Sequence, residues 1–279
     1  MSEIVVGTDG TAASREALLW SLEQAVRTGS DVTALFVWRI PLELEIPFDF
    51  ETISSLREDL SRRDVSGFPQ ITAASLNGNP GPVLVERARE ADLLVVGARH
   101  HTDLRGSVSS YCLHHSRTPV VVVPGDAPSR PHLRQRVAVG VNLTPDSAVA
   151  LQWASREARS RDAELVVAHA WQVAPGSLGD LAHHAHTQRV QEQRAGEDLR
   201  NWVGDVLGPA PPTRVQMHAD HGGPLDTLLN HAAEADLLVL GSRGHRALAR
   251  LLGGSLSAQL ALHSDCPIVV VPPADQQRS

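Results

Sequence analysis

The sequence predicts an α/β protein of two tandem domains, each a five-stranded parallel sheet with helices on both faces. Three observations predict it. The 279 residues suffice for two cores. Segments of the first half recur in the second half in the same order. Short strands that are apolar on both faces alternate with helical segments. We place the domains at residues 1–126 and 135–279, with a polar, proline-bearing linker at 125–131 between them.

The internal repeat is the main organising feature of the chain. Glu90–Gly97, read EADLLVVG, recurs 144 residues later as EADLLVLG at Glu234–Gly241. Pro119–Pro124 recurs 148 residues later at Pro267–Pro272, and the opening strand recurs 133 residues later. Chance similarity of apolar strands does not explain three ordered blocks that share a Glu-Ala-Asp sequence. The two halves are therefore expected to have the same fold.

Each half is expected to begin with a strand and a helix and to continue as alternating strands and helices. The expected strands are 4–7, 32–38, 71–76, 92–97 and 119–123, and then 136–141, 164–171, 214–219, 236–241 and 267–271. Helices are expected from about residue 12 and residue 145, at 83–91 and 225–235, and over 256–262. Thr144-Pro145 is typical of an N-cap followed by proline at the first helical position. Ligands of such sheets bind at the carboxyl ends of the strands.

Composition excludes several classes of partner and chemistry. The net charge of −7 argues against nucleic acid, which is bound by a basic surplus. The chain has no lysine, which excludes a Walker A lysine and Schiff-base catalysis. No apolar run approaches the roughly 18 residues of a membrane helix. The start of the chain lacks a signal-peptide pattern, and its two cysteines make no disulfide framework, so we expect a cytoplasmic protein.

The segment after the ninth expected strand carries the binding chemistry. Gly241 and Gly244 allow the backbone to bend and approach a ligand, and Gly254-Ser255 precedes an apolar helix. A helix N-terminus with small side chains favours anions, so this segment is a candidate phosphate cradle without lysine. On glycine content alone, a role of these glycines in turns and a C-cap is the better interpretation, since isolated glycines are common. Arg243 and His245 could contact phosphate or be solvated loop charges.

Gly241-x-x-Gly244, nine residues, then Gly254-Ser255 resembles the ATP-binding signature of the universal stress protein family. The resemblance covers both halves, including Val5–Thr11 and Cys266–Pro272. It implies an adenine-nucleotide-hydrolase-like, Rossmann-like fold that binds ATP, with or without Mg²⁺. It also implies that these glycines and the serine hold triphosphate and ribose, and that the residue after the first strand meets the adenine. The candidate nucleotide-binding residues are Gly140, Asn142, Thr144, Ala170, Gly241, Arg243, Gly244, His245, Gly254, Ser255, Leu256 and Ser257.

The two halves depart from that signature in opposite ways. The first half keeps an acidic residue, Asp9, but its loop is four residues shorter and has His100 in place of the second glycine. Asp103 adds a charge that repels phosphate. The second half keeps the complete loop but has Asn142 in place of the aspartate, which retains a carbonyl acceptor. We therefore expect binding in the second half, and secondary candidates in the first half are Asp9, Gly97, Gly106 and Ser107.

We expect no metal site or catalytic site at the other clusters of histidine and cysteine. His183, His184 and His186 could share a metal, but no carboxylate or cysteine stands at ligand spacing, and we expect an exposed segment and no metal. Cys112 and Cys266 are expected to be inert thiols at the edge of the core. No serine–histidine–acid arrangement is recognisable, so we expect no catalytic residues.

Three functions remain open at this stage. The leading one is an adenine-nucleotide-binding regulatory protein of the stress response. The second is a slow ATPase, with weak hydrolysis at most, and the third is an interaction scaffold that binds no nucleotide. The family resemblance further implies that the two halves pair through their last strands as a pseudo-dimer within one chain. Exposed apolar edges invite such pairing, and assembly of two chains into a homodimer is a further expectation.

Overall fold

The chain folds into two compact units, Met1–Pro128 (unit 1) and Ser129–Ala274 (unit 2). The structure, a computed structural model, describes residues 2–38, 70–98, 107–125, 134–172, 181–209, 211, 213–242 and 256–274, with the side chains of 181–187 left aside. Within these ranges no helix has the length and apolar character needed to cross a membrane.

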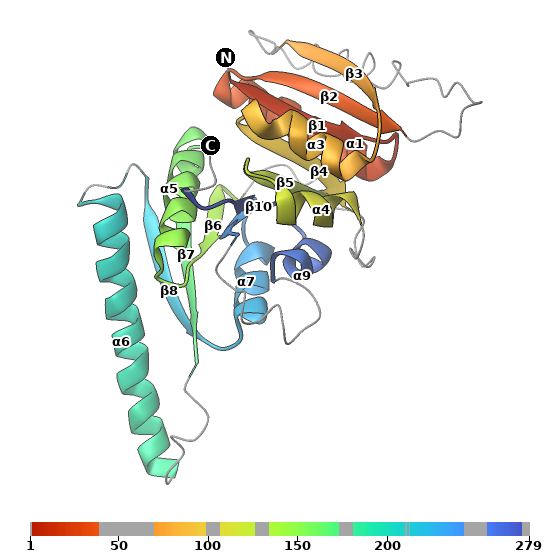
Figure 1. The fold of residues 1–279 in the computed structure, drawn as a ribbon. Coiled ribbons are helices and arrows are strands. Elements are labelled where there is room, and N and C mark those ends of the chain that lie inside the picture. The colour runs from red at the N-terminus through yellow and green to blue at the C-terminus, as the bar shows by residue number, and fades with distance from the viewer. Residues whose placement is uncertain are drawn as a thin grey trace. The chain divides into compact units, whose positions relative to one another are not determined.

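Unit 1 is a five-stranded parallel sheet with helices (Figure 1). Its strands lie in the order β3-β2-β1-β4-β5. In chain order the elements are β1 (Glu3–Thr8), α1 (Ala12–Thr28), β2 (Asp31–Trp38), β3 (Ile71–Asn77), α3 (Pro80–Arg87), the 3₁₀ turn η1 (Ala88–Glu90), β4 (Leu93–Ala98), α4 (Val108–His115) and β5 (Val120–Pro124).

Unit 2 repeats this topology. Its strands lie in the order β8-β7-β6-β9-β10, again all parallel, which matches the order β3-β2-β1-β4-β5 of unit 1 position for position. The elements are β6 (Arg136–Gly140), α5 (Pro145–Ser160), β7 (Glu164–Trp171), α6 (Leu181–Leu207), β8 (Val215–His221), α7 (Pro224–Ala233), β9 (Leu237–Gly241), α9 (Leu256–His263) and β10 (Ile268–Val271). The expected fold class, two tandem five-stranded parallel sheets, is confirmed.

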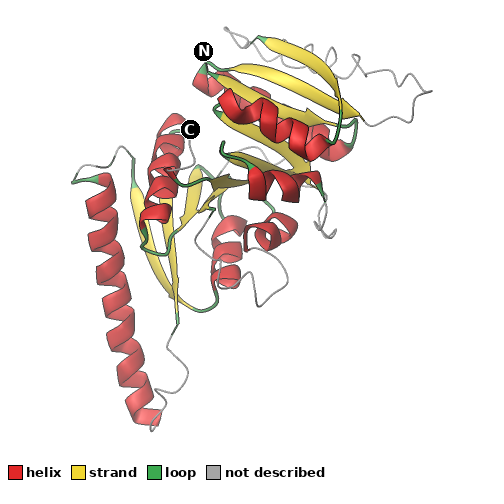
Figure 2. Cartoon of the chain, viewed as in Figure 1, coloured by secondary structure: helices red, strands yellow, loops and turns green. Residues whose placement is uncertain are grey.

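Two glycines show that helices cover both faces of the sheet in unit 1. A β-carbon on Gly7 would meet Leu84 of α3, whereas one on Gly97 would meet Ala13 of α1. Val6 pairs with Val95, and side chains alternate along a strand, so Gly7 and Gly97 face opposite sides. Helices α1 and α3 therefore lie on opposite faces, and in Figure 2 helices likewise flank the strands of unit 2 on both sides.

The core is made by strands that are buried on both faces. Every residue of β5 and the first four residues of β4 are buried, and β9 and β10 of unit 2 show the same pattern. Valine and leucine dominate these strands because a parallel ladder covered on both sides has no solvated face to carry polar residues. This continuous burial is what the apolar repeats in the sequence encode.

Helix α3 differs from its expected range. It begins at Pro80 rather than at residue 83, and it passes into the 3₁₀ turn η1 after Arg87. Proline fits the first turn of a helix, where its missing N–H would have no partner. Proline at the equivalent place, Pro224, opens α7 in the same way.

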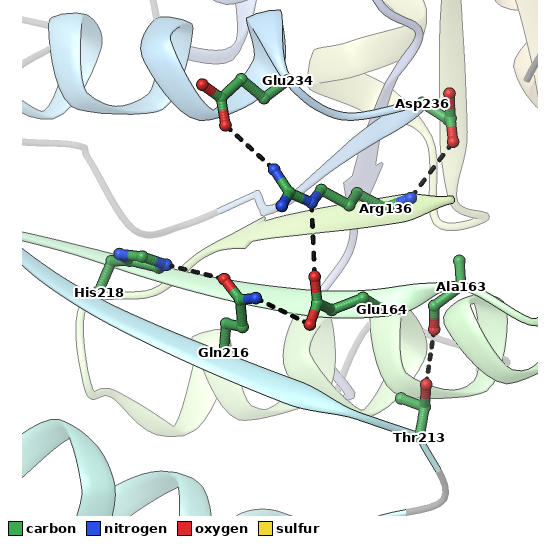
Figure 3. A network of polar contacts seen from close by, with 8 residues as sticks. All are labelled: Arg136, Ala163, Glu164, Thr213, Gln216, His218, Glu234 and Asp236. Atoms are coloured by element: carbon green, nitrogen blue, oxygen red, sulfur yellow. Dashed lines mark hydrogen bonds and ion pairs between the residues drawn. The ribbon is translucent and has the colours of Figure 1, made fainter. Parts of the chain in front are cut away.

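The aspartate of the repeated Glu-Ala-Asp sequence locks the first strand of each unit at its amino end. The backbone N–H of Asp236 donates to the carbonyl of Arg136 (2.9 Å), and its carboxylate accepts from the N–H of Arg136 (3.2 Å; Figure 3). Asp92 makes the same two hydrogen bonds with Glu3, at 2.9 and 3.0 Å. The repeat therefore conserves a backbone clamp between the first and fourth strands of each unit.

The side chains around this clamp carry opposite charges in the two units. In unit 2 the guanidinium of Arg136 pairs with Glu164 (3.4 Å) and Glu234 (3.1 Å), as Figure 3 shows. In unit 1 the equivalent residue is Glu3, and it pairs with Arg87 at 2.6 Å. Both pairings are partly exposed, so each contributes about 1 kcal/mol or less. The clamp is common to the two units, whereas its ion pairs are not.

The ion pair of Glu3 predicts a pH-dependent stability. Burial raises the pKa of Glu3, but hydrogen bonds from Thr33 and Arg87 and the charge of Arg87 outweigh it, so the pKa lies below its ordinary value of 4.5. Its contribution is therefore present at neutral pH and is lost as the pH falls through the folded-state pKa. Glu3→Gln should lower the free energy of unfolding by roughly 0.5–1 kcal/mol at pH 7, in denaturant titrations.

That difference should begin to shrink as the pH falls past 4.5, the ordinary pKa of the carboxyl, and should approach zero only below the lowered pKa of the folded state, where the carboxyl of the folded protein is protonated too. Glu86→Gln is a matched control, because Glu86 pairs with Arg89 while both side chains are more than half exposed. A Glu3→Gln defect that persists unchanged at low pH would contradict the argument.

Candidate nucleotide-binding site

The carboxyl edge of unit 2 gathers several of the predicted site residues. Because neighbouring strands are parallel, β6, β7 and β9 all end at the same edge. Gly140 closes β6 and Gly241 closes β9, Ala170 is next to last in β7, and Asn142 and Thr144 follow β6 before α5 begins. Leu256 and Ser257 open α9. Arg243, Gly244, His245, Gly254 and Ser255 lie outside the described residues.

A tight turn follows the first strand of each unit. In unit 2 the hydroxyl of Thr144 donates to Oδ1 of Asn142 at 2.6 Å. In unit 1 the hydroxyl of Thr11 donates to Oδ1 of Asp9 at 2.6 Å, and the N–H of Thr11 donates to the same oxygen at 3.0 Å. In unit 1 these are the hydrogen bonds of an Asx turn, whereas in unit 2 the N–H of Thr144 donates to the hydroxyl of Ser147 and the bond between the two side chains is kept. Replacing the aspartate by Asn142 therefore removes a negative charge while the turn is kept.

The turn leads directly into the N-terminus of helix α5. Thr144 is the N-cap, with extended backbone, and Pro145 follows at the first helical position, as predicted. The hydroxyl of Ser147 accepts from the N–H of Thr144 (3.1 Å) and donates to its carbonyl (3.0 Å). The N–H end of the α5 dipole thus lies at the edge where β6 ends, which favours a negatively charged ligand there.

The glycines at the strand ends leave room for the helices that pack against the sheet, apart from any role toward a ligand. A β-carbon on Gly140 would lie 2.7 Å from the side chain of Leu228 in α7. One on Gly241 would lie 3.3 Å from the carbonyl oxygen of Asp146 in α5, and one on Gly97 would lie 2.4 Å from that of Ala13. Glycine at position 140 therefore leaves room for Leu228 of α7, and its place in a ligand site stays a prediction.

In unit 1 the start of α4 satisfies its own polar groups. The hydroxyl of Ser107, the N-cap, accepts from the N–H of Ser110 at 3.1 Å. The hydroxyl of Ser109 donates to the carbonyl of Gly97, at the end of β4, at 2.9 Å. One of the N–H groups that an anion would seek at a helix N-terminus is thus already paired. Gly106 lies outside the described residues.

Two features of the edge were not recognised from the sequence. Nδ1 of His169 in β7 lies 3.0 Å from the carbonyl oxygen of Val141, and since a carbonyl only accepts, this nitrogen carries the proton. Leu143, the middle residue of the turn, has a left-handed φ of 57°. Alignment of the halves could have pointed to both, because the equivalent residues of unit 1 are Phe36 and Gly10.

The histidines and cysteines that the structure describes outside this edge make no recognisable site. Nε2 of His231 lies 2.8 Å from Oδ2 of Asp220. In the ranges that the structure describes, no group of three or more metal-ligating side chains is suitably arranged. His183, His184 and His186 lie in α6, where only the backbone is described. Burial raises the pKa of Cys112 to about 12 and that of Cys266 to about 11, so both thiols are protonated at neutral pH.

Comparison with known proteins decides the family. The model of the universal stress protein family matches residues 1–124 and again residues 134–272. The chain belongs to the universal stress protein family. A universal stress protein of Mycobacterium tuberculosis is 30% identical, with 96% of this chain and 95% of that protein aligned. One from Mycolicibacterium smegmatis is 28% identical, with 97% of each aligned.

A solved structure supports the fold over the whole chain. The crystal structure of a universal stress protein from Archaeoglobus fulgidus matches with a TM-score of 0.63. It covers 98% of this chain and 97% of its own, at 20% identity. This universal stress protein therefore shares its two-unit α/β fold with a relative of low sequence identity.

The close approach of strand end to helix predicts unequal effects of one substitution in the two units. Gly97→Ala places a β-carbon 2.4 Å from a backbone oxygen, which cannot rotate away, and it should lower the free energy of unfolding by about 1–3 kcal/mol. Gly241→Ala, at 3.3 Å, should cost less than about 1 kcal/mol. Urea denaturation of the two variants, followed by circular dichroism, measures both. Equal costs, or a larger cost at Gly241, would be inconsistent with this packing.

Proposed function

We propose that this universal stress protein binds an adenine nucleotide, ATP foremost, at the carboxyl edge of unit 2, and serves as a nucleotide-responsive regulator in stress. The observation that carries the proposal is the meeting of three features at that edge. These are the turn at Asn142, the N-terminus of α5 and the strand end at Gly241, from which the glycine-rich segment 241–255 departs.

The turn and the strand end each match one part of a nucleotide. The side-chain amide of Asn142 offers hydrogen-bonding groups to the edge of an adenine. The phosphates are assigned to the segment from Gly241 to Ser255 and to the N–H groups at the start of α9, where a helix dipole favours anions. Arg243 and His245 are the side chains proposed to contact them, since the chain has no lysine. Mg²⁺, if bound, would accompany the triphosphate.

Unit 1 is proposed to bind nucleotide weakly or not at all. Its loop is shorter by four residues, and His100 stands where the second glycine belongs. The contacts of Ser107 and Ser109 support this, because they pair groups at the start of α4 and the end of β4 within the protein. The same contacts favour the alternative in which the chain is an interaction scaffold without a ligand. Pairing of the halves through their last strands, and a homodimer, stay predictions.

Mass spectrometry of the ligand released from purified protein separates the proposals. Release of ATP, ADP or AMP supports nucleotide binding, and its absence, together with no heat on calorimetric titration with ATP, leaves the scaffold. A phosphate-release assay on the ATP-bound protein then distinguishes a regulator from a slow ATPase. Turnover that is abolished by Gly244→Val would establish the ATPase.

Three substitutions assign the site to a unit. Gly244→Val should abolish ATP binding, because a β-carbon blocks close approach of the backbone and disfavours positive φ. Asn142→Ala should weaken binding by about 1–3 kcal/mol, as expected for one lost hydrogen bond in a buried site. Asp9→Ala, the matched change in unit 1, should leave affinity nearly unchanged. Isothermal titration calorimetry with ATP measures all three.

The opposite pattern has a clear meaning. Loss of binding in Asp9→Ala with retention in Gly244→Val would place the site in unit 1 and overturn the assignment to unit 2.

A further inference from the structure

Leu143 adopts a backbone conformation that leucine rarely takes. Its φ of 57° lies in the left-handed region, where the β-carbon is crowded by the backbone. Within the described ranges, the other non-glycine residues with positive φ are Gln135 and Asp162. Aspartate is enriched in this region because its short side chain hydrogen-bonds locally, but leucine has no such compensation. Strain of this kind persists where the surroundings enforce it, and it is frequent at ligand sites.

The turn itself does not require a leucine. Gly10, at the equivalent position of unit 1, has a φ of 78° and allows the same side-chain hydrogen bond of 2.6 Å in its turn. A β-carbon on Gly10 would find no atom within 4 Å, so the position faces open space in unit 1. Glycine thus builds this turn without strain. The leucine of unit 2 adds an isobutyl group that the turn does not need.

The core does not explain the leucine either. Val141, two residues earlier, is 7% exposed and belongs to the core, whereas Leu143 is only half-buried. Its side chain therefore gains part of the hydrophobic stabilisation that full burial would give, and at the cost of backbone strain. Since neither the turn nor the core accounts for Leu143, we look for its role at the surface of the carboxyl edge.

The chemistry of the edge indicates what the side chain contacts. Relative to Asp9-Gly10, the pair Asn142-Leu143 removes one negative charge and adds an apolar group, so both changes make this edge less polar. A purine base has a polar edge and two apolar faces, and an amide beside an aliphatic side chain matches that combination. We propose that Leu143 is a specificity-determining residue whose side chain packs on a face of the nucleobase read by Asn142. This inference rests on the proposed nucleotide site of unit 2.

Removing the leucine should change stability and binding in different directions. Leu143→Gly relieves the strain, so the melting temperature without ligand should stay the same or rise. Its affinity for ATP and for AMP should fall by similar factors, about 5- to 20-fold, because the lost apolar contact is to the base that the two ligands share. Leu143→Met, which keeps an apolar side chain, should retain most of the affinity. Calorimetric titrations with ATP and AMP, with thermal melts, give both readouts.

Asp162→Gly is the matched control. Asp162 has a φ of 50° in the turn before β7, at the amino edge of the same sheet, so its replacement should relieve strain without changing either affinity. Unchanged affinity in Leu143→Gly would overturn the inference, as would a fall in its melting temperature, which indicates a core role. A loss confined to ATP would also overturn it, because it indicates a phosphate contact. Wild-type protein that binds neither ligand would instead overturn the proposed function, and this inference with it.

Discussion

The parallel ladder buried on both faces is the constraint on which each unit depends. The backbone groups of its inner strands have no water to bond with, so these strands must be paired along their length. The helices that connect successive strands make the pairing parallel. The aspartate at the start of β4 or β9 begins this pairing by accepting and donating at the first residue of β1 or β6. With the amino ends aligned in this way, the carboxyl ends meet at one edge, and the candidate site follows from that.

The two units show which parts of this scaffold can vary. At the amino edge the backbone clamp is kept while the charge of the first residue is reversed between Glu3 and Arg136, because exposed ion pairs contribute little to stability. At the carboxyl edge the turn is kept, with the same 2.6 Å hydrogen bond, while the residues that face outward change. The two units therefore share the hydrogen bonds that hold the strand ends, whereas the charge and polarity of the side chains beside those bonds differ between them.

This division accounts for a chain with two similar folds and one proposed ligand site. Unit 1 has the unstrained Gly10 and serine hydroxyls that pair the start of α4 and the end of β4 internally. Unit 2 has a neutral Asn142 followed by the strained Leu143, whose backbone conformation fold stability alone does not favour. The unit that carries a strained residue is therefore the unit to which we assign the proposed ligand site.

The sequence by itself determined the repeat, the strands, the helix start at Thr144-Pro145 and the position of Asn142 after β6, because these depend on local periodicity and capping. The tertiary structure decided why Gly140 is a glycine, since its neighbour Leu228 lies far along the chain. It also decided the bond from His169 to Val141, made across neighbouring strands, and the left-handed Leu143. The contact joins residues distant in sequence, and leucine carries no local preference for positive φ, so local patterns predict neither. Alignment with Phe36 and Gly10 marks the two positions without giving their geometry.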